Sequence, residues 1–215
     1  MRAERARSFL DRTHRFTVAW VYEVPWYRNS GRWFRKNLLG NWVLSGMYTA
    51  ESPQYATVQS GLDSNRNLDG ATDRVVVNPR GADRTGSDVT ALMNSDGDVV
   101  GYLADNPNAR YVKAGPGVHP DGGRNTLPLR GINNFDVSVS KRFSVGESKA
   151  IEFRAAFYNA LNHPQYTPGS LNSTRAVASR DTRNNLIPGH RLFDRPDQVY
   201  DSHAREIHLV LRFTF

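Results

Sequence analysis

The sequence predicts an all-β protein: an antiparallel transmembrane β-barrel segment of about five strands, a fragment of a larger barrel, with two long extracellular loops. Three observations support this prediction. Apolar and polar residues alternate with the period of a β-strand in several stretches, the connections between these stretches are short and long in turn, and the chain closes on an apolar strand that ends in an aromatic residue.

The last strand, at 205–215, shows the alternation most clearly. Its large apolar residues share one parity: Ile207, Leu209, Leu211, Phe213 and Phe215. Polar residues take the other parity, and Val210 is the apolar exception. This period gives a strand one apolar and one wet face, which in an outer-membrane barrel turn toward lipid and lumen.

Composition agrees with a barrel and excludes a helical membrane protein. The chain has 215 residues and a mean hydropathy of −0.59, without a run of about 18 apolar residues. It has no cysteine, which favours an envelope or extracellular setting. The basic start at 1–10 lacks the apolar core of a signal peptide. A barrel needs export, so we expect that Met1 is not the start of the complete gene product.

The charge pattern predicts no nucleic-acid partner, and the motifs predict no enzyme. The net charge is +7, but the arginines are scattered and no helix gathers them on one face. The six histidines have no metal-binding spacing, and no nucleophile elbow or phosphate-binding loop occurs. No cofactor is therefore expected, with calcium, discussed below, as the one open possibility.

Four further strands precede the last one. We expect them at 14–25, 41–59, 133–144 and 149–161, the first ended by Pro25. The long connections, about 61–132 and 162–204, are rich in Gly, Asp, Asn, Arg and Pro, and both are expected to be irregular. If the carboxyl end lies on the periplasmic side, both long connections lie outside and both short ones inside.

Several segments resemble the C-terminal barrel of TonB-dependent outer-membrane receptors, most closely the Oar-like group with a carboxypeptidase-regulatory-like domain. They are D-R-T-H-R-F-T-V-A-W-V-Y-E-V-P at 11–25, K-N-L-L-G-N-W-V-L-S-G-M-Y-T-A at 36–50, N-N-F-D-V-S-V-S-K-R-F at 133–143, I-E-F-R-A-A-F-Y-N-A-L-N-H-P at 151–164 and the terminal L-V-L-R-F-T-F. Members of this family hold a plug domain inside a barrel of about 22 strands and draw energy from TonB. In their last strand a glycine usually stands where this chain has Val210.

The resemblance implies a location in the cell outer membrane and the import of a ligand. The implied partners are outer-membrane lipid, the missing N-terminal barrel strands and plug, TonB through that plug, and the barrel-assembly machinery. Leu211, Phe213 and Phe215 would form the signal that this machinery reads. Two alternatives stay open: an outer-membrane adhesin or structural surface protein without transport, and a soluble secreted β-sandwich with binding loops. The ligand itself cannot be identified.

The residues at the polar positions of the expected strands are candidates for the lumen wall, where their side chains would contact the plug or solvent. These candidates are Arg15, Glu23, Asp136, Arg142, Glu152, Arg154, Tyr158, Glu206, His208 and Arg212. Trp26, Trp33 and Phe34 stand among basic residues in the first short connection, which suits a membrane–water interface; the alternative is an ordinary basic turn.

Oxygen-bearing side chains recur in the loop at 63–73, which makes it a calcium candidate. They are Asp63, Asn65, Asn67, Asp69 and Asp73. The spacing departs from an EF-hand, because no glutamate stands at the twelfth position from Asp63 or Asn65. The alternative is a solvated turn built on Asp and Asn side chains.

Overall fold

The computed structural model describes residues 4–68, 73–145, 149–166 and 183–215. The chain divides into two compact units. We call Thr13–Ser52, Ile132–Gln165 and His203–Phe215 the strand unit. The connection unit consists of Met1–Arg12, Pro53–Gly131 and Tyr166–Ser202. No helix in the described part of the chain is long and apolar enough to cross a membrane.

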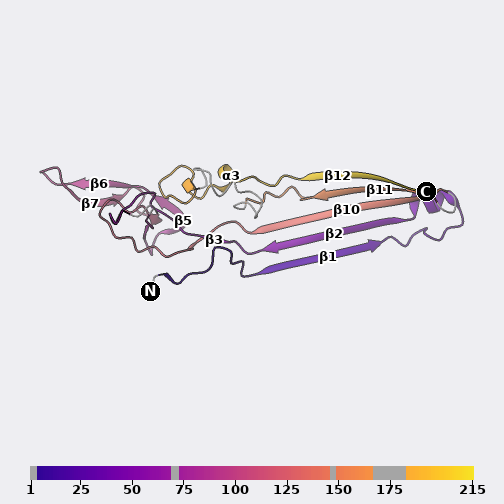
Figure 1. The fold of residues 1–215 in the computed structure, drawn as a ribbon, viewed down its shortest axis with the longest axis horizontal. Coiled ribbons are helices and arrows are strands. Elements are labelled where there is room, and N and C mark those ends of the chain that lie inside the picture. The colour runs from indigo at the N-terminus through magenta and orange to yellow at the C-terminus, as the bar shows by residue number, and fades with distance from the viewer. Residues whose placement is uncertain (1–3, 69–72, 146–148, 167–182) are drawn as a thin grey trace. The chain divides into compact units, whose positions relative to one another are not determined.

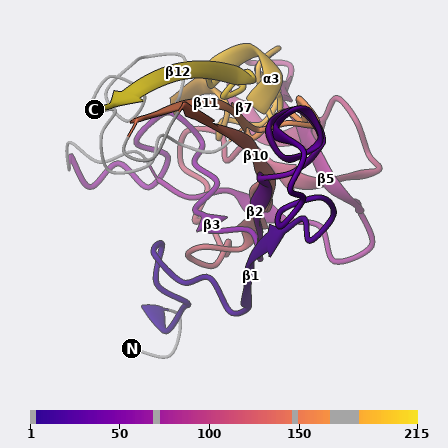
Figure 2. The same cartoon turned by 90° about the vertical axis from the view of Figure 1, so that its right-hand side faces the viewer.

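The strand unit contains a five-stranded antiparallel sheet, which confirms the predicted all-β antiparallel fold class. Its strands, in spatial order, are β1 (Arg15–Glu23), β2 (Trp42–Glu51), β10 (Ile132–Val145), β11 (Lys149–Tyr158) and β12 (Glu206–Thr214). Figures 1 and 2 show them side by side in this order. Within this unit, strands that are adjacent in the sheet are also consecutive along the chain, as in the wall of an up-and-down barrel.

The register brings the apolar parities of all five strands onto one face. One row across the sheet joins Trp20, Gly46, Val137, Phe157 and Ile207. The next row, on the opposite face, joins Val21, Ser45, Ser138, Ala156 and His208. Because successive side chains of a strand alternate in direction, the sheet has one apolar and one largely polar face.

The apolar face is exposed to its surroundings. Leu209, Leu211 and Phe213 are 68%, 59% and 63% exposed, and no second sheet pairs with these strands in the described strand unit. A β-sandwich would bury such residues against a facing sheet. The strand unit therefore lacks the layer that the soluble alternative requires.

The connection unit is built from short strands. They are β3 (Tyr55–Ala56) with β9 (Leu127–Pro128), β4 (Val76–Val77) and β5 (Ala82–Ser87) on either side of β8 (Ala109–Val112), and β6 (Val89–Met93) with β7 (Val99–Ala104). Buried Val58, Val75, Tyr111 and Leu127 form its core. A helical turn, α3 (Pro196–Val199), lies in the part contributed by the second long connection.

Two expectations about irregular segments are corrected. The strand expected at 41–59 ends at Glu51, and Tyr55–Ala56 pairs instead with Leu127–Pro128. The region expected to be irregular, 61–132, carries most of the short strands of the connection unit and three of its four core residues. These strands are two to six residues long, too short to leave a period that the sequence could reveal.

Trp20 and Gly46 form a tight pair between β1 and β2. A Cβ on Gly46 would lie 2.6 Å from the indole of Trp20, so the ring covers the bare backbone. An aromatic residue opposite a glycine restores the packing that the glycine lacks. This pair fastens the outermost strand, β1, to the rest of the sheet.

We predict that Gly46→Ala destabilises the sheet by about 1–2 kcal/mol, because the new methyl group must displace the indole. In a Trp20→Ala background the same change should cost nothing or stabilise, since the space is then free and alanine is less flexible than glycine. Urea unfolding in detergent micelles over the four variants measures this coupling. Equal effects of Gly46→Ala in both backgrounds would contradict the packing described.

Candidate functional sites on the polar face, at the sheet ends and in the connections

The ten candidate lumen residues all lie on the polar face of the sheet. The register alone places them there, with Arg142, Glu152 and Arg212 in one row across β10, β11 and β12. Opposite charges in neighbouring strands attract across such a row. At the other end of the sheet, Arg15 Nε lies 3.1 Å from Glu51 Oε1.

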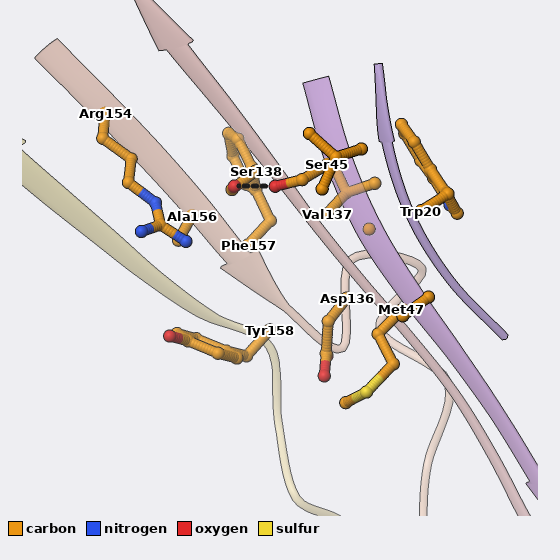
Figure 3. Close-up of a pocket in the computed structure, with 13 residues that line it drawn as sticks. Trp20, Ser45, Met47, Asp136, Val137, Ser138, Arg154, Ala156, Phe157 and Tyr158 are labelled. Carbon is orange, nitrogen blue, oxygen red and sulfur yellow. Dashed lines mark hydrogen bonds between the residues drawn. The ribbon is translucent and has the colours of Figure 1, made fainter. Parts of the chain in front are cut away.

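A hollow of about 400 Å³ opens on this face. Figure 3 shows Asp136, Arg154 and Tyr158 around it, with Ser45 and Ser138 joined by a hydrogen bond of 2.7 Å. The Tyr158 ring also meets the imidazole of His208 edge-on, at 5.1 Å between centroids. Acidic, basic and hydroxyl groups share this wall with apolar side chains such as Val21 and Met47.

Asn159 closes the end of β11 with a set of hydrogen bonds that the sequence did not reveal. Its Nδ2 donates to the carbonyls of His163 (2.9 Å) and His203 (2.8 Å), and its Oδ1 accepts from His163 N (2.9 Å). Its own N–H donates to Asp136 Oδ1 at 2.8 Å. The residue is 6% exposed and has φ of 48°, a conformation that asparagine tolerates.

Neighbouring residues extend this set of hydrogen bonds, which we call the Asn159 clamp, to the strands on either side. Gln165 Oε1 accepts from Asn133 N at 2.8 Å, which ties the chain to the start of β10. Asn162 Oδ1 accepts from Arg205 N at 3.1 Å, just before β12. The one sequence feature that could have indicated the clamp is the density of amide side chains in N-A-L-N-H-P, because Asn side chains readily bond nearby backbone.

The β1–β2 connection (residues 24–41) presents its aromatic residues outward on an anchored backbone. Trp26, Trp33 and Phe34 are 68%, 66% and 63% exposed. A π-helical turn, η2 (Arg35–Leu39), is held by Asn37, whose Oδ1 accepts from Ser144 N at 2.9 Å. The exposure of the three rings agrees with the expected membrane–water interface, which stays a prediction.

Lys141 is an exception on the apolar face, beside this connection. It stands in the row between Trp42 and Phe153 and is 2% exposed. Its ammonium donates to the Gly40 carbonyl and lies 5.1 Å from the centroid of Trp42 and 5.3 Å from that of Phe143. The two rings and the carbonyl stabilise a charge that would otherwise be costly on an apolar surface.

Within the connection unit, Asp194 joins the two long connections. Arg84 donates from Nε and Nη2 to its two carboxylate oxygens at 2.8 and 2.5 Å, and from Nη1 to the Pro128 carbonyl at 2.6 Å. Phe193 packs edge-on against Tyr111, with centroids 6.2 Å apart. Two loops that are distant in sequence thereby become one folded body.

The N-terminal segment belongs to the same body. The Arg7 guanidinium lies over the Tyr55 ring, 4.9 Å from its centroid, and the Arg7 carbonyl accepts from Asn125 Nδ2 at 2.6 Å. Arg74 and Arg124 both pair with Glu4. The connection unit thus combines the N-terminal segment with parts of both long connections.

The calcium candidate at 63–73 has the geometry of an Asx-rich turn. Asp63 accepts from the N–H groups of Asn67 (3.1 Å) and Leu68 (2.9 Å), and Asp73 accepts from Ser64, Asn65 N and Asn65 Nδ2 at 2.8 to 3.0 Å. Asp69 lies outside the described residues. Among the residues that are described, no three His, Asp or Glu side chains gather as a metal site.

The same hydrogen bonds govern the acidity of Asp73. Burial raises its pKa, but the bonds from Asn65 and Ser64, together with the charge of Arg74, outweigh that effect and hold the pKa below its usual value. The ionised carboxylate therefore contributes to the stability of the turn.

The residues of the expected assembly signal lie on the exposed apolar face, beside side chains of β11. Phe215 is 97% exposed, and Leu211 and Phe213 lie in rows with Phe153 and Ile151 of β11. Recognition of this end by the barrel-assembly machinery stays a prediction.

Comparison with known proteins identifies a family. The model of a family described as "Outer membrane beta barrel domain" matches residues 1–186. No curated protein and no solved structure matches the chain significantly.

We predict that Asn159→Gly destabilises the strand unit by about 2 kcal/mol or more, because glycine keeps the positive φ but leaves buried backbone groups unpaired. Asn162→Gly is the matched control, since Asn162 also has positive φ and its side chain bonds only toward Arg205 N in the described structure. We expect less than half the effect there. Denaturant unfolding in micelles measures both, and equal losses would contradict the clamp.

A pH dependence follows from Asp73. Because its pKa is lowered in the folded protein, its contribution to stability is present above about pH 4, the usual carboxyl range, and is lost as the pH falls through the folded value. Asp73→Asn should therefore lower the melting temperature at pH 7, and the gap to the unmodified chain should shrink toward pH 3. A gap that is constant with pH would refute this role.

Proposed function

The chain belongs to the outer membrane beta barrel domain family and lies in the outer membrane; on that premise we propose that it forms the C-terminal barrel wall of a TonB-dependent, Oar-like receptor that imports a ligand. This proposed function is more specific than membership of the family. Its main support is the sheet with one exposed apolar face and one polar face, whose long connections fold into a separate body.

The direction of the edge strands supports a barrel completed by further strands. In an antiparallel sheet of five strands, β1 and β12 run the same way. Closing the sheet on itself or on a second copy in the same orientation would pair them in parallel. An all-antiparallel barrel instead needs an odd number of additional strands between them, which a larger receptor barrel would supply.

In the proposed receptor, the two faces have separate tasks. The apolar face contacts lipid, and the exposed rings of Trp26, Trp33 and Phe34 lie at the periplasmic interface. The polar face, with Asp136, Arg154 and its other charged residues, lines the lumen and contacts the plug. The connection unit captures ligand outside, and TonB moves the plug to release it inward.

We propose no catalytic role for the chain. The charged residues of the polar face that approach one another form structural contacts, such as Arg15 with Glu51 and His208 with Glu206. Such pairs stabilise a wall and orient no nucleophile or general base toward a bound substrate.

An adhesin without transport is the second candidate. The observation that favours it is the connection unit, which has a core of its own and ion pairs between distant segments, such as Arg84 with Asp194. A folded body of this kind could bind a surface partner with no need of a plug. The two candidates differ in one respect that can be measured, which is contact with TonB.

Cross-linking in living cells tests the choice. We expect that the native outer-membrane protein that contains this chain, isolated after formaldehyde treatment, carries TonB detectable with antibody. A strain that lacks TonB, and a strain whose TonB lacks its periplasmic domain, serve as controls. A native protein with no plug segment and no cross-link to TonB would refute the receptor and favour the adhesin.

A further inference from the structure

The β6–β7 hairpin is a well-formed arm of the connection unit. Its strands pair antiparallel from Val89 with Ala104 to Leu92 with Gly101. At the tip, Asn94 Oδ1 accepts from the N–H groups of Asp96 (3.0 Å) and Asp98 (2.8 Å), and Gly97 supplies the positive φ of 87°. The turn chemistry and the strand register therefore agree on one conformation.

The hairpin is anchored to the rest of its unit at its base and by Tyr102, which stands opposite Ala91 in the middle of the hairpin. Tyr102 donates to the Pro116 carbonyl at 3.0 Å, and its ring fills the space beside Gly115, where a Cβ would come within 2.5 Å. Lys113 pairs with Asp88 at 3.2 Å. Beyond these contacts the two strands form a sheet of their own, without a third strand from the described residues. Figure 1 shows the hairpin extending past β5 of the same unit.

Large apolar side chains are exposed on this arm. Leu92, Met93, Val99, Val100 and Leu103 are 46%, 66%, 48%, 66% and 60% exposed. An isolated hairpin gains little stability in water by displaying such residues, and a cluster of them in a folded protein marks a contact surface. The open edges of both strands offer backbone donors and acceptors for a further strand.

The charge of the arm is opposite to that of the chain. Residues 85–109 contain Asp88, Asp96, Asp98 and Asp105 and no Lys, Arg or His, whereas the whole chain has a net charge of +7. An acidic arm on a basic protein repels anionic headgroups and attracts cations. The complementary occupant therefore combines positive charge, apolar side chains and an extended backbone.

We propose that the β6–β7 hairpin binds a cationic, partly apolar polypeptide segment, which adds to it as a third β-strand. The inference rests on the proposed function, because it names a polypeptide as the ligand class that the connection unit captures. Backbone hydrogen bonds supply affinity, Leu92 and Leu103 supply apolar contact on the face opposite the anchored Tyr102, and the aspartates select for basic residues.

Peptide binding tests this inference on the full chain in a neutral detergent. The probe is a fluorescent peptide of about eight residues that alternates Lys and Val, and anisotropy reports its binding. We expect saturable binding that weakens about tenfold or more in the Leu92→Thr, Leu103→Thr double variant, since contact residues of this kind dominate such interfaces. Threonine retains strand propensity, so the hairpin should still fold. Leu10→Thr, at a residue 70% exposed in the same unit, should bind as the unmodified chain does.

Two further probes separate the parts of the proposal. A peptide that alternates Glu and Val should not bind, and an N-methylated Lys/Val peptide should bind poorly because it cannot donate to a strand edge. Absent binding of the Lys/Val peptide, or equal binding by the N-methylated form or by the double variant, would overturn the inference. So would a dimer in sedimentation that the double variant dissociates, because the hairpin would then serve a second copy. None of these assays involves TonB, so their failure is distinct from failure of the receptor proposal.

Discussion

The antiparallel register of the five strands is the constraint on which the rest of the structure depends, because side chains alternate with a period of two. A slip of one residue in any strand would turn its apolar set to the polar face. The ends of the sheet hold the register. At one end Asn37 bonds both the N–H and the carbonyl of Ser144, and at the other the Asn159 side chain bonds the carbonyls of His163, after β11, and His203, before β12. A wall between lipid and lumen is possible only with this alignment.

The connection unit shows how long loops form one folded body without long strands. Its core is small, and ion pairs between distant segments also hold it together. Both carboxylate oxygens of Asp194 accept hydrogen bonds from Arg84, and Arg130 Nη2 lies 3.7 Å from Asp194 Oδ2. Such a bidentate pair is geometrically specific, so it fixes the second long connection against the first. In the proposed receptor, a folded body of this kind presents the β6–β7 arm already formed, which lowers the entropic cost of binding a ligand.

The sequence predicts what has a long local period and misses what depends on contacts between distant residues. The five wall strands and their faces follow from alternation over nine or more residues in each strand. The environment of Lys141 could not be predicted, because this residue has the apolar parity of β10 and the Gly40 carbonyl that accepts from it lies in the distant β1–β2 connection. The Asn159 clamp and the Arg84–Asp194 pair join residues 44 and 110 positions apart, which no pattern in one sequence encodes.

Lipid accessibility of single cysteines tests the central claim most directly, since the chain has no cysteine of its own. A fluorophore would be attached in turn to positions 207–213 of β12, with the protein reconstituted in vesicles. The structure predicts a period of two: brominated lipid quenches the label at Ile207→Cys, Leu209→Cys and Leu211→Cys, and aqueous iodide quenches it at His208→Cys and Arg212→Cys. Equal quenching at all positions, or the opposite parity in lipid, would contradict the wall described.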